Sequence, residues 1–265
     1  MPLKLNPYSK EFYTDSTEKL QVITVPTRSD NYTFLILNEE KTKAALVDSA
    51  DHKVVPKTLR ELNLELECIL LTHHHFDHVE GLDVILSKHP HAKLYCSKKE
   101  AQRGVFSSPH TEVKEGDSIK LFGDSVKVME TPGHTVSHLS YCFTESKALF
   151  CGDTLFSLGC GRVFENEPGI FESYFNSFQA LKKTVDKKSL VFCAHEYTEA
   201  NLEFCETNNL TTPQARTELQ NRLKNYNFER TVPSDFEFEL NHNPFLKAES
   251  TQGLKNIRAL KDNFT

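Results

Sequence analysis

The feature that most constrains this chain is the stretch LLTHHHFDHVEG at residues 70–81. Four histidines and one aspartate fall within the six positions from His73 to His78, directly after an apolar run and just before a glycine. In extended backbone, alternate side chains point the same way, so His73 and His75 share a face while His74 points away from it. The stretch therefore predicts a cluster of imidazole ligands at the end of a buried strand.

Three other apolar runs also end at a residue type that binds metals. VKVMETPG leads to His134, ALFCG to Asp153 and LVFCA to His195. Strand ends at one edge of a layered sheet can converge, so we expect these side chains to meet the histidine cluster. Asp77 and His78 follow at the predicted start of a helix, where the positive end of the helix suits a carboxylate.

These residues can be divided between two metal ions. We define the first metal group as His73, His75 and His134, and the second metal group as Asp77, His78 and His195. Asp153 could bridge the two ions with its two carboxylate oxygens. Imidazole and carboxylate ligands suit Zn, Fe or Mn. We therefore expect two divalent ions per chain, with zinc first and iron or manganese as alternatives.

The remaining histidines are expected to have ordinary roles. His74 should not be a ligand, because it alternates with two residues that are. His138 is expected to be structural, with a supporting role beside the ligands as the alternative. The others are predicted to be surface or core residues: His52, His89, His91, His110 and His242.

Short apolar or alternating runs predict nine strands. They cover residues 20–25, 32–37, 44–47, 68–71, 92–95, 125–129, 138–143, 148–151 and 190–193. Helical spacing predicts helices at residues 54–63, 80–89 and 174–185. Many hairpin-like strands with few helices favour a mixed α/β layered domain over a doubly wound parallel sheet.

The predicted secondary structure changes after residue 195. Strand signals become rare, and helices are predicted at residues 197–209, 211–226 and 251–264, the second with Pro213 at its first turn. We therefore expect three parts. They are a polar N-terminal extension at 1–20, a catalytic domain at 21–195 and a helical substrate-binding domain at 196–265.

Composition limits the partners and the compartment. A net charge of −6 disfavours nucleic acid as the main partner. No long apolar run predicts a membrane span, and no secretory signal is seen at the N-terminus. Seven cysteines without a CxxC pair predict reduced thiols. We therefore expect a cytoplasmic monomer that binds neither nucleic acid nor membrane.

Four motifs together, THHHFDH, TPGH, CGDTLF and CAHEYT, resemble those of the metallo-β-lactamase superfamily. Within it, the chain most closely resembles glyoxalase II, the hydroxyacylglutathione hydrolases, from about residue 21 to the C-terminus. Features outside the ligand set add to this resemblance. They are DNY at 30–32, GCGRVFE at 159–165, HEYT at 195–198, NPF at 243–245 and a terminal RxxK.

The resemblance implies an αββα sandwich with a binuclear metal site, followed by a small helical domain that completes the substrate pocket. It implies hydrolysis of S-D-lactoylglutathione to D-lactate and glutathione, the second step of methylglyoxal detoxification. A metal-bridging hydroxide would attack the thioester, with Asp77 and Asp153 as the catalytic carboxylates. The family's metal ligands fall on the two metal groups and Asp153.

The resemblance also implies contacts with the substrate. The implied residues are Arg162, Phe164, His195, Tyr197, Arg258 and Lys261. Arg258 and Lys261 are three residues apart on the last predicted helix, so they share a face and could hold one carboxylate. Some family members carry Lys and Tyr at the positions of Arg162 and Phe164, so the charge is kept here and a hydroxyl is lost.

Three alternatives compete with this interpretation. A mononuclear-iron dioxygenase of the same fold, acting on glutathione persulfide, would need only one metal, and the complete second metal group argues against it. A secreted β-lactamase would need a signal peptide. A non-enzymatic, metal-stabilised binding module would have closed sites with four protein ligands, often cysteines, and no cysteine falls in this ligand set.

Overall fold

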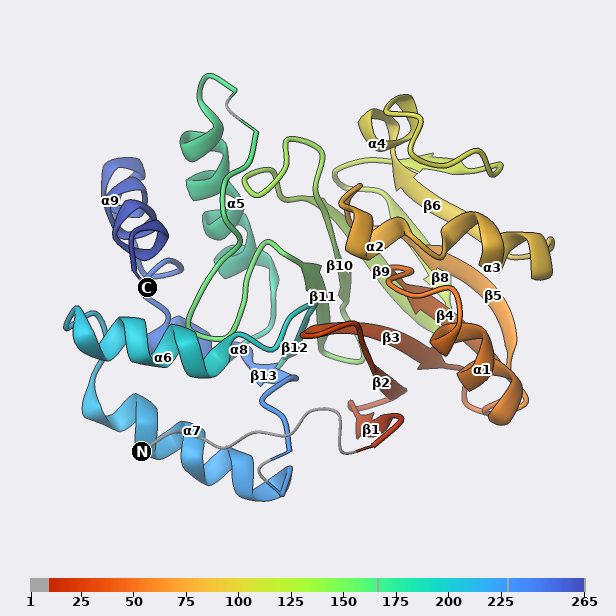
Figure 1. The fold of residues 1–265 in the computed structure, drawn as a ribbon, viewed down its shortest axis with the longest axis horizontal. Coiled ribbons are helices and arrows are strands. Elements are labelled where there is room, and N and C mark those ends of the chain that lie inside the picture. Colours follow the sequence, from red (N-terminus) through yellow and green to blue (C-terminus); the bar gives the residue numbers. More distant parts are fainter. Residues whose placement is uncertain (1–9, 166, 228, 265) are drawn as a thin grey trace.

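The computed structural model describes residues 10–165, 167–227 and 229–264, and it contains two β-sheets packed face to face (Figure 1). The first sheet follows the order of the chain: β1 (Tyr13–Ser16), β2 (Gln21–Thr27), β3 (Asn31–Leu37), β4 (Lys43–Val47), β5 (Glu65–Leu70), β6 (Lys93–Ser97) and β7 (Thr111–Val113). It is antiparallel as far as β4 and parallel from β4 onward.

The second sheet has six strands in the spatial order β13-β12-β11-β10-β9-β8. Their bounds are β8 (Ser118–Leu121), β9 (Asp124–Glu130), β10 (Leu139–Phe143), β11 (Ala148–Gly152), β12 (Leu190–Cys193) and β13 (Ser234–Asp235). β11 and β12 run parallel, and the other pairs are antiparallel. Because parallel neighbours end at the same edge of a sheet, the residues that follow β11 and β12 emerge close together.

Alternating side chains divide the first sheet between two cores. Phe34 and Ile36 belong to the large core shared with the second sheet, where Phe34 packs edge-on against Phe150. Leu35 and Leu37 belong to the other core, which they share with the helices α1 (Val54–Glu61) and α3 (Leu82–Lys88). Full burial of such side chains contributes about 1.5–3 kcal/mol each, so both faces of this sheet must be covered.

Helix α5 (Ile170–Thr184) packs beside the second sheet, where the Tyr174 hydroxyl donates to the carbonyl of Thr154 just after β11 at 2.7 Å. Two short helices, α2 (Phe76–Val79) and α4 (Lys98–Gln102), follow β5 and β6. The result is the expected αββα sandwich. None of the helices in the described residues is long and apolar enough to cross a membrane.

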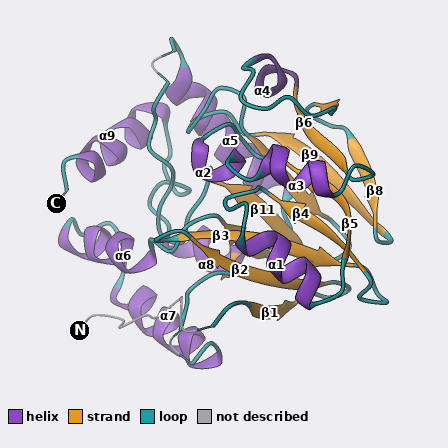
Figure 2. Ribbon diagram, turned by 45° about the vertical axis from the view of Figure 1, so that its right-hand side comes forward, coloured by secondary structure: helices purple, strands orange, loops and turns teal. Residues whose placement is uncertain are grey.

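The C-terminal helices α6 (Thr198–Thr207), α7 (Pro213–Asn225) and α9 (Thr251–Asp262) gather at one end of the sandwich (Figures 1 and 2). α9 contacts α5. This part of the chain is also joined to the second sheet, because β13 pairs with β12 and leads into α8 (Phe236–His242). The C-terminal part is therefore attached through a strand as well as through helix packing.

All nine predicted strands and all six predicted helices are present, with bounds that differ by a few residues. The elements that the sequence patterns missed are short: β1, β7, β8, β13, α2, α4 and α8. Runs of two to seven residues carry too little periodicity to stand out from loops.

The prediction of a polar extension at residues 1–20 was wrong for its later part; residues 1–9 lie outside the described residues. Residues 13–16 form β1, and its Asp15 makes a buried ion pair with Arg230 at 2.7 Å. Thr24 on β2 donates to the other oxygen of Asp15. The polar residue that looked like part of a tail thus joins the N-terminal strand to the C-terminal part of the chain.

We predict that Asp15→Ala lowers the free energy of unfolding by about 3–5 kcal/mol, because it leaves the buried Arg230 guanidinium without its carboxylate. Chemical denaturation measures this change. Lys10→Ala is the matched control, since Lys10 pairs with Glu229 across the same two regions but the two side chains are 50% and 20% exposed. It should cost less than about 1 kcal/mol. Equal effects of the two substitutions would contradict the prediction.

Candidate active site

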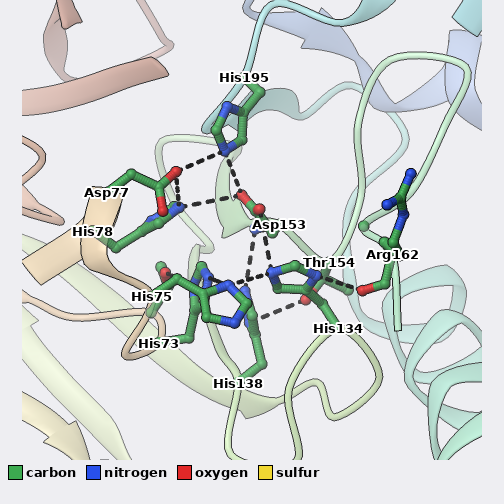
Figure 3. Close-up of polar contacts among 12 residues, drawn as sticks. His73, His75, Asp77, His78, His134, His138, Asp153, Thr154, Arg162 and His195 are labelled. Carbon is green, nitrogen blue, oxygen red and sulfur yellow. Dashed lines mark hydrogen bonds and ion pairs between the residues drawn. The ribbon is translucent and has the colours of Figure 1, made fainter. Parts of the chain in front are cut away.

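The predicted ligands come from four separate segments of the chain, and their side chains lie close together (Figure 3). His73 and His75 follow β5, and Asp77 and His78 lie in α2. His134 lies between β9 and β10, Asp153 follows β11 and His195 follows β12. Because β11 and β12 run parallel, the residues after them emerge at the same edge. The structure brings all seven residues together.

The first metal group is closely spaced. The Nδ1 atom of His75 lies 3.1 Å from Nε2 of His73 and 2.9 Å from Nε2 of His134. The ligand-type atoms of the three histidines all lie within 4.8 Å of one another, a spacing that one ion could span. His73 and His134 are buried and His75 is partly open.

The second metal group is also closely spaced, and one of its three members is a carboxylate. Oδ2 of Asp77 lies 3.6 Å from Nε2 of His78 and 3.4 Å from Nε2 of His195. These three ligand atoms also lie within 4.8 Å of one another. The members of each predicted group therefore lie close together, and a third ligand-type cluster, His73 with His78 and Asp153, connects the two groups.

Asp153 lies between the two groups and turns one oxygen toward each (Figure 3). Its Oδ2 is 3.3 Å from Nε2 of His134 in the first metal group. Its Oδ1 is 3.4 Å from Nε2 of His78 and 3.3 Å from Nε2 of His195 in the second metal group. A carboxylate in this position is suited to bridge two cations.

Two atoms at the centre of the site support metal binding directly. Nε2 of His78 and Oδ1 of Asp153 are buried and have no hydrogen-bond partner. A buried polar atom without a partner costs free energy, and a coordinated cation would remove that cost. The site therefore binds divalent metal, and its nitrogen and oxygen donors fit the transition metals that favour imidazole and carboxylate.

The pKa values of the histidines in the site also support metal binding. Burial lowers the pKa of His75 to about 4 and holds that of His73 well below its usual range, so both imidazoles are neutral, as ligands must be. Burial also lowers the pKa of His78, but the carboxylates of Asp48 and Asp153 outweigh it and raise the value to about 10. The same negative field attracts a metal cation.

Residues outside the ligand set hold the imidazoles in place. Asp48, at a φ of 58°, accepts from Nδ1 of His78 at 2.7 Å and from the backbone and hydroxyl of Thr72, each at 2.8 Å. The Thr72 hydroxyl lies 3.0 Å from Nδ1 of His73. Nδ1 of His134 donates to the carbonyl of Arg162 at 2.6 Å. Such partners fix the ring orientation and the tautomer of a metal ligand.

The non-ligand histidines lie where alternation placed them, or outside the site. His74 turns to the fully buried Glu100, with Nδ1 3.0 Å from Oε2. His138 is buried beneath the site, and its Nε2 accepts from the amide of Asp153 at 3.1 Å, so it supports the bridging residue. None of the five other histidines belongs to the ligand-type clusters found in the described residues.

A cavity of about 400 Å³ adjoins the metal groups, and five of the six predicted substrate residues line it, all except His195. His134 and Asp153 line it together with Arg162, Phe164, Tyr197, Arg258 and Lys261. Phe156, Cys160, Gly161, Ala200 and Asn201 complete the lining and were not predicted. None of the five carries a formal charge at neutral pH that a sequence pattern could single out.

The cationic residues of this cavity are not all equally free. Arg258 is buried, and its guanidinium donates to the carbonyl of Cys160 at 2.9 Å and pairs with Oδ1 of Asp262 at 2.9 Å. The Nε atom of Arg162 lies 3.3 Å from the same Asp262 oxygen, although the side chain is 58% exposed. Lys261 is partly exposed and donates to the carbonyl of Ala200 at 2.9 Å.

The aromatic residues of the cavity lie against the metal ligands. Phe164 is 61% exposed and packs edge-on against His75 and His134, with ring centres 5.3 and 5.5 Å apart. Tyr197 stacks on His195 at 4.7 Å, and burial raises the pKa of its hydroxyl to about 12. The cavity thus has aromatic walls near the metal groups and cationic groups from the last helix.

Comparison with known proteins identifies both parts of the chain. A family model described as the metallo-beta-lactamase superfamily matches residues 27–195, and one described as the hydroxyacylglutathione hydrolase C-terminus matches residues 196–264. A hydroxyacylglutathione hydrolase from Synechococcus sp. (strain JA-2-3B'a(2-13)) is 38% identical, covering 92% of this chain and 100% of its own. One from Vibrio campbellii is 37% identical, covering 90% of each.

Solved structures share the fold. ETHE1 from Myxococcus xanthus has a TM-score of 0.65 at 23% identity, over 96% of this chain and 95% of its own. The BLEG-1 B3 metallo-beta-lactamase has a TM-score of 0.61 at 20% identity, over 85% of this chain and 99% of its own. The fold and the paired metal groups define a metal-dependent enzyme of the metallo-β-lactamase superfamily. Within that superfamily, the chain belongs to the hydroxyacylglutathione hydrolases.

We predict that Asp153→Ala lowers metal content at both metal groups. Both groups lose a shared oxygen ligand, and loss of an outer partner alone costs about 10–100-fold in metal affinity or activity. Turnover should fall by more than about 100-fold. Elemental analysis after dialysis, with turnover, measures both effects. Retention of two metals with near-normal turnover, or loss of one metal alone, would show that Asp153 does not bridge.

We predict that His74→Ala keeps both metals and much of the activity. Its cost should appear in stability, about 1–3 kcal/mol, because the buried carboxylate of Glu100 loses one partner and keeps Ser137 and Arg103. His73→Ala is the matched comparison, one position away and in the first metal group. Metal loss in His74→Ala as severe as in His73→Ala would mean that His74 is a ligand.

Proposed function

We infer that this chain is a thioester hydrolase that converts S-D-lactoylglutathione to D-lactate and glutathione, the second step of methylglyoxal detoxification. One observation carries this conclusion. A single cavity is lined both by metal-group residues, His134 and Asp153, and by the cationic residues of the last helix, Arg258 and Lys261. The names of the curated relatives and the C-terminal family match support the same reaction.

The proposed cofactor is a pair of divalent ions, one in each metal group, with Asp153 between them. Zinc is the first candidate, and iron or manganese would accept the same nitrogen and oxygen donors. Bound metal would supply Lewis-acid charge and a water molecule whose pKa is lowered from 15.7 to about 7. Asp77 and Asp153 are the proposed catalytic carboxylates, which would hold the ions and orient the water molecule that they activate.

The leaving group explains why no further acid is needed. A free thiol has a pKa of about 8.5, so the glutathione thiolate departs without strong protonation by the protein. The chain's own contribution is then to orient the carbonyl and to exclude competing conformations. Phe164 and Tyr197 are proposed to do this, because both lie against imidazoles of the metal groups.

The carrier is proposed to be held by charge. The chain is net −6 and glutathione thioesters are anionic, so a local positive surface must attract them. Lys261 is a partly exposed residue and the side chain of Arg162 is 58% exposed, whereas Arg258 is buried and donates to the carbonyl of Cys160. We therefore assign direct carboxylate contacts to Lys261 and Arg162, and to Arg258 mainly the support of the cavity wall.

The division of labour along the chain is also a proposal. Residues 21–195 would carry the metal chemistry and 196–265 would bind the carrier, with β1 added to the first sheet. We further propose a cytoplasmic monomer that binds neither nucleic acid nor membrane. The seven cysteines are all free and buried, which is typical of a reducing compartment. Sedimentation at micromolar concentration tests the monomer.

Turnover of S-D-lactoylglutathione by the metal-loaded protein, with metal content per chain, tests the proposed reaction. Hydrolysis at two metals per chain is the expected result. Oxygen consumption with glutathione persulfide at one metal per chain would instead identify a dioxygenase, which the complete second metal group argues against. Absence of both activities at full metal loading would leave a metal-stabilised binding module.

We predict that Lys261→Ala raises KM for the glutathione thioester by about 10-fold and leaves kcat within about 3-fold. A hydrogen bond to a charged group contributes about 1.5–3 kcal/mol, and a contact far from the reacting bond is alike in ground and transition states. Steady-state kinetics with S-D-lactoylglutathione measure this. A small uncharged thioester should be hydrolysed equally by both proteins.

Lys255→Ala is the matched control on the same helix, because Lys255 does not line the 400 Å³ cavity. Arg258→Ala should behave differently and lower kcat as well, since Arg258 holds the segment whose Arg162 carbonyl accepts from His134. An unchanged KM in Lys261→Ala would place the carrier elsewhere.

A further inference from the structure

The DNY segment at residues 30–32 lies beside the second metal group but supplies none of its ligands. Asp30 ends the turn after β2, and Asn31 and Tyr32 begin β3. Oδ1 of Asp30 accepts from Nδ1 of His195 at 2.9 Å. Because a carboxylate can only accept, that bond favours the tautomer with the proton on Nδ1 and leaves Nε2 free to bind a metal.

Asn31 acts on the other flexible ligand of the same group. Its side-chain amide donates to Oδ2 of Asp77 at 2.8 Å, the oxygen that faces both His78 and His195. Asn31 is buried, so its amide has few other orientations. Two successive residues therefore orient two of the three members of the second metal group.

The backbone of the segment is fixed to the residues after β12 that include His195. The amide of Glu196 donates to the carbonyl of Asp30 at 2.9 Å, and the amide of Tyr32 donates to the carbonyl of Ala194 at 2.7 Å. These bonds lie on either side of His195, and they join the first sheet to the second. Asp30 and Asn31 are thus held in register with the residues that they orient.

The first metal group is supported by other parts of the chain. His73 is held by the Thr72 hydroxyl and His134 by the carbonyl of Arg162. No hydrogen bond among the described residues joins Asp30 or Asn31 to a histidine of the first metal group. The two groups therefore have separate supports, apart from the shared ligand Asp153 and the link from Asp48 through Thr72.

We propose that Asp30 and Asn31 are positioning residues that set the affinity of the second metal group, and so determine whether the centre holds two metals or one. This inference rests on the proposed two-metal function but requires no particular substrate. A general structural role for the turn would lower stability or weaken both metals alike. A positioning role weakens one metal and leaves the other.

The test is titration of Zn²⁺ into metal-free protein against a competing chromogenic chelator, in two backgrounds. His134→Ala leaves the second metal group intact, and His195→Ala leaves the first. Asp30→Ala and Asn31→Ala should each raise the Kd for Zn²⁺ about 10–100-fold in the His134→Ala background. In the His195→Ala background neither should change it by more than about 3-fold.

Two variants control the chemistry of the contact. Asp30→Asn keeps an acceptor oxygen for His195 and should lose less affinity than Asp30→Ala. Ser29→Ala removes only a hydroxyl that donates to the other oxygen of Asp30, at 3.2 Å, and should bind like the parent protein. If Asp30→Ala does not fold, Asp30→Asn and Asn31→Ala still give the comparison.

The inference would be overturned if Asp30→Ala and Asn31→Ala left the Kd for Zn²⁺ unchanged in both backgrounds. It would also be overturned if they raised that Kd equally in both. A wild-type chain that binds only one Zn²⁺ would instead overturn the two-metal function. The two failures are therefore distinguishable in a single set of titrations.

Discussion

The burial of one carboxylate, Asp153, between two sets of imidazoles is the interaction on which the rest of the site depends. Its oxygens lie 3.3 and 3.4 Å from histidines on either side, so neither sheet can shift without separating them. Both sheets must therefore present their strand ends at one edge. The face-to-face packing of aromatic and aliphatic side chains from β3, β10, β11 and β12 fixes that edge.

Around this centre, the protein uses fixed acceptors to turn flexible ligands into a rigid site. Asp48 accepts from Nδ1 of His78, and Asp30 accepts from Nδ1 of His195. The backbone carbonyl of Arg162 accepts from Nδ1 of His134. Each acceptor comes from a different segment, so the orientation of the ligands is a property of the tertiary fold. Gly161 permits a close approach, since a Cβ there would overlap the carbonyl oxygen of Asp153 and would lie 2.7 Å from Nδ1 of His134.

Sequence patterns predicted the strands, the main helices and the grouping of the ligands, because apolar periodicity and two-residue alternation survive into the fold. They could not predict β1, where Asp15 looks like an ordinary solvated residue until Arg230 is brought beside it by the fold. They likewise gave no role to Asp30 and Asn31, whose contacts join positions 165 and 46 residues apart. They also did not predict that Arg258 is buried and already paired.

Asp262 is an internal carboxylate that competes with any anionic ligand for two cations of the cavity, Arg258 and Arg162. One oxygen of this side chain pairs with Arg258 and lies 3.3 Å from Nε of Arg162, so in the proposed function an incoming carboxylate would exchange with an internal one and would not meet an unpaired guanidinium. The net gain in free energy is then a difference between two similar contacts. In the proposed reaction, the thiol product would keep every group of the carrier that the cavity is proposed to bind. Weak binding by such an exchange would let that product leave before the next thioester enters.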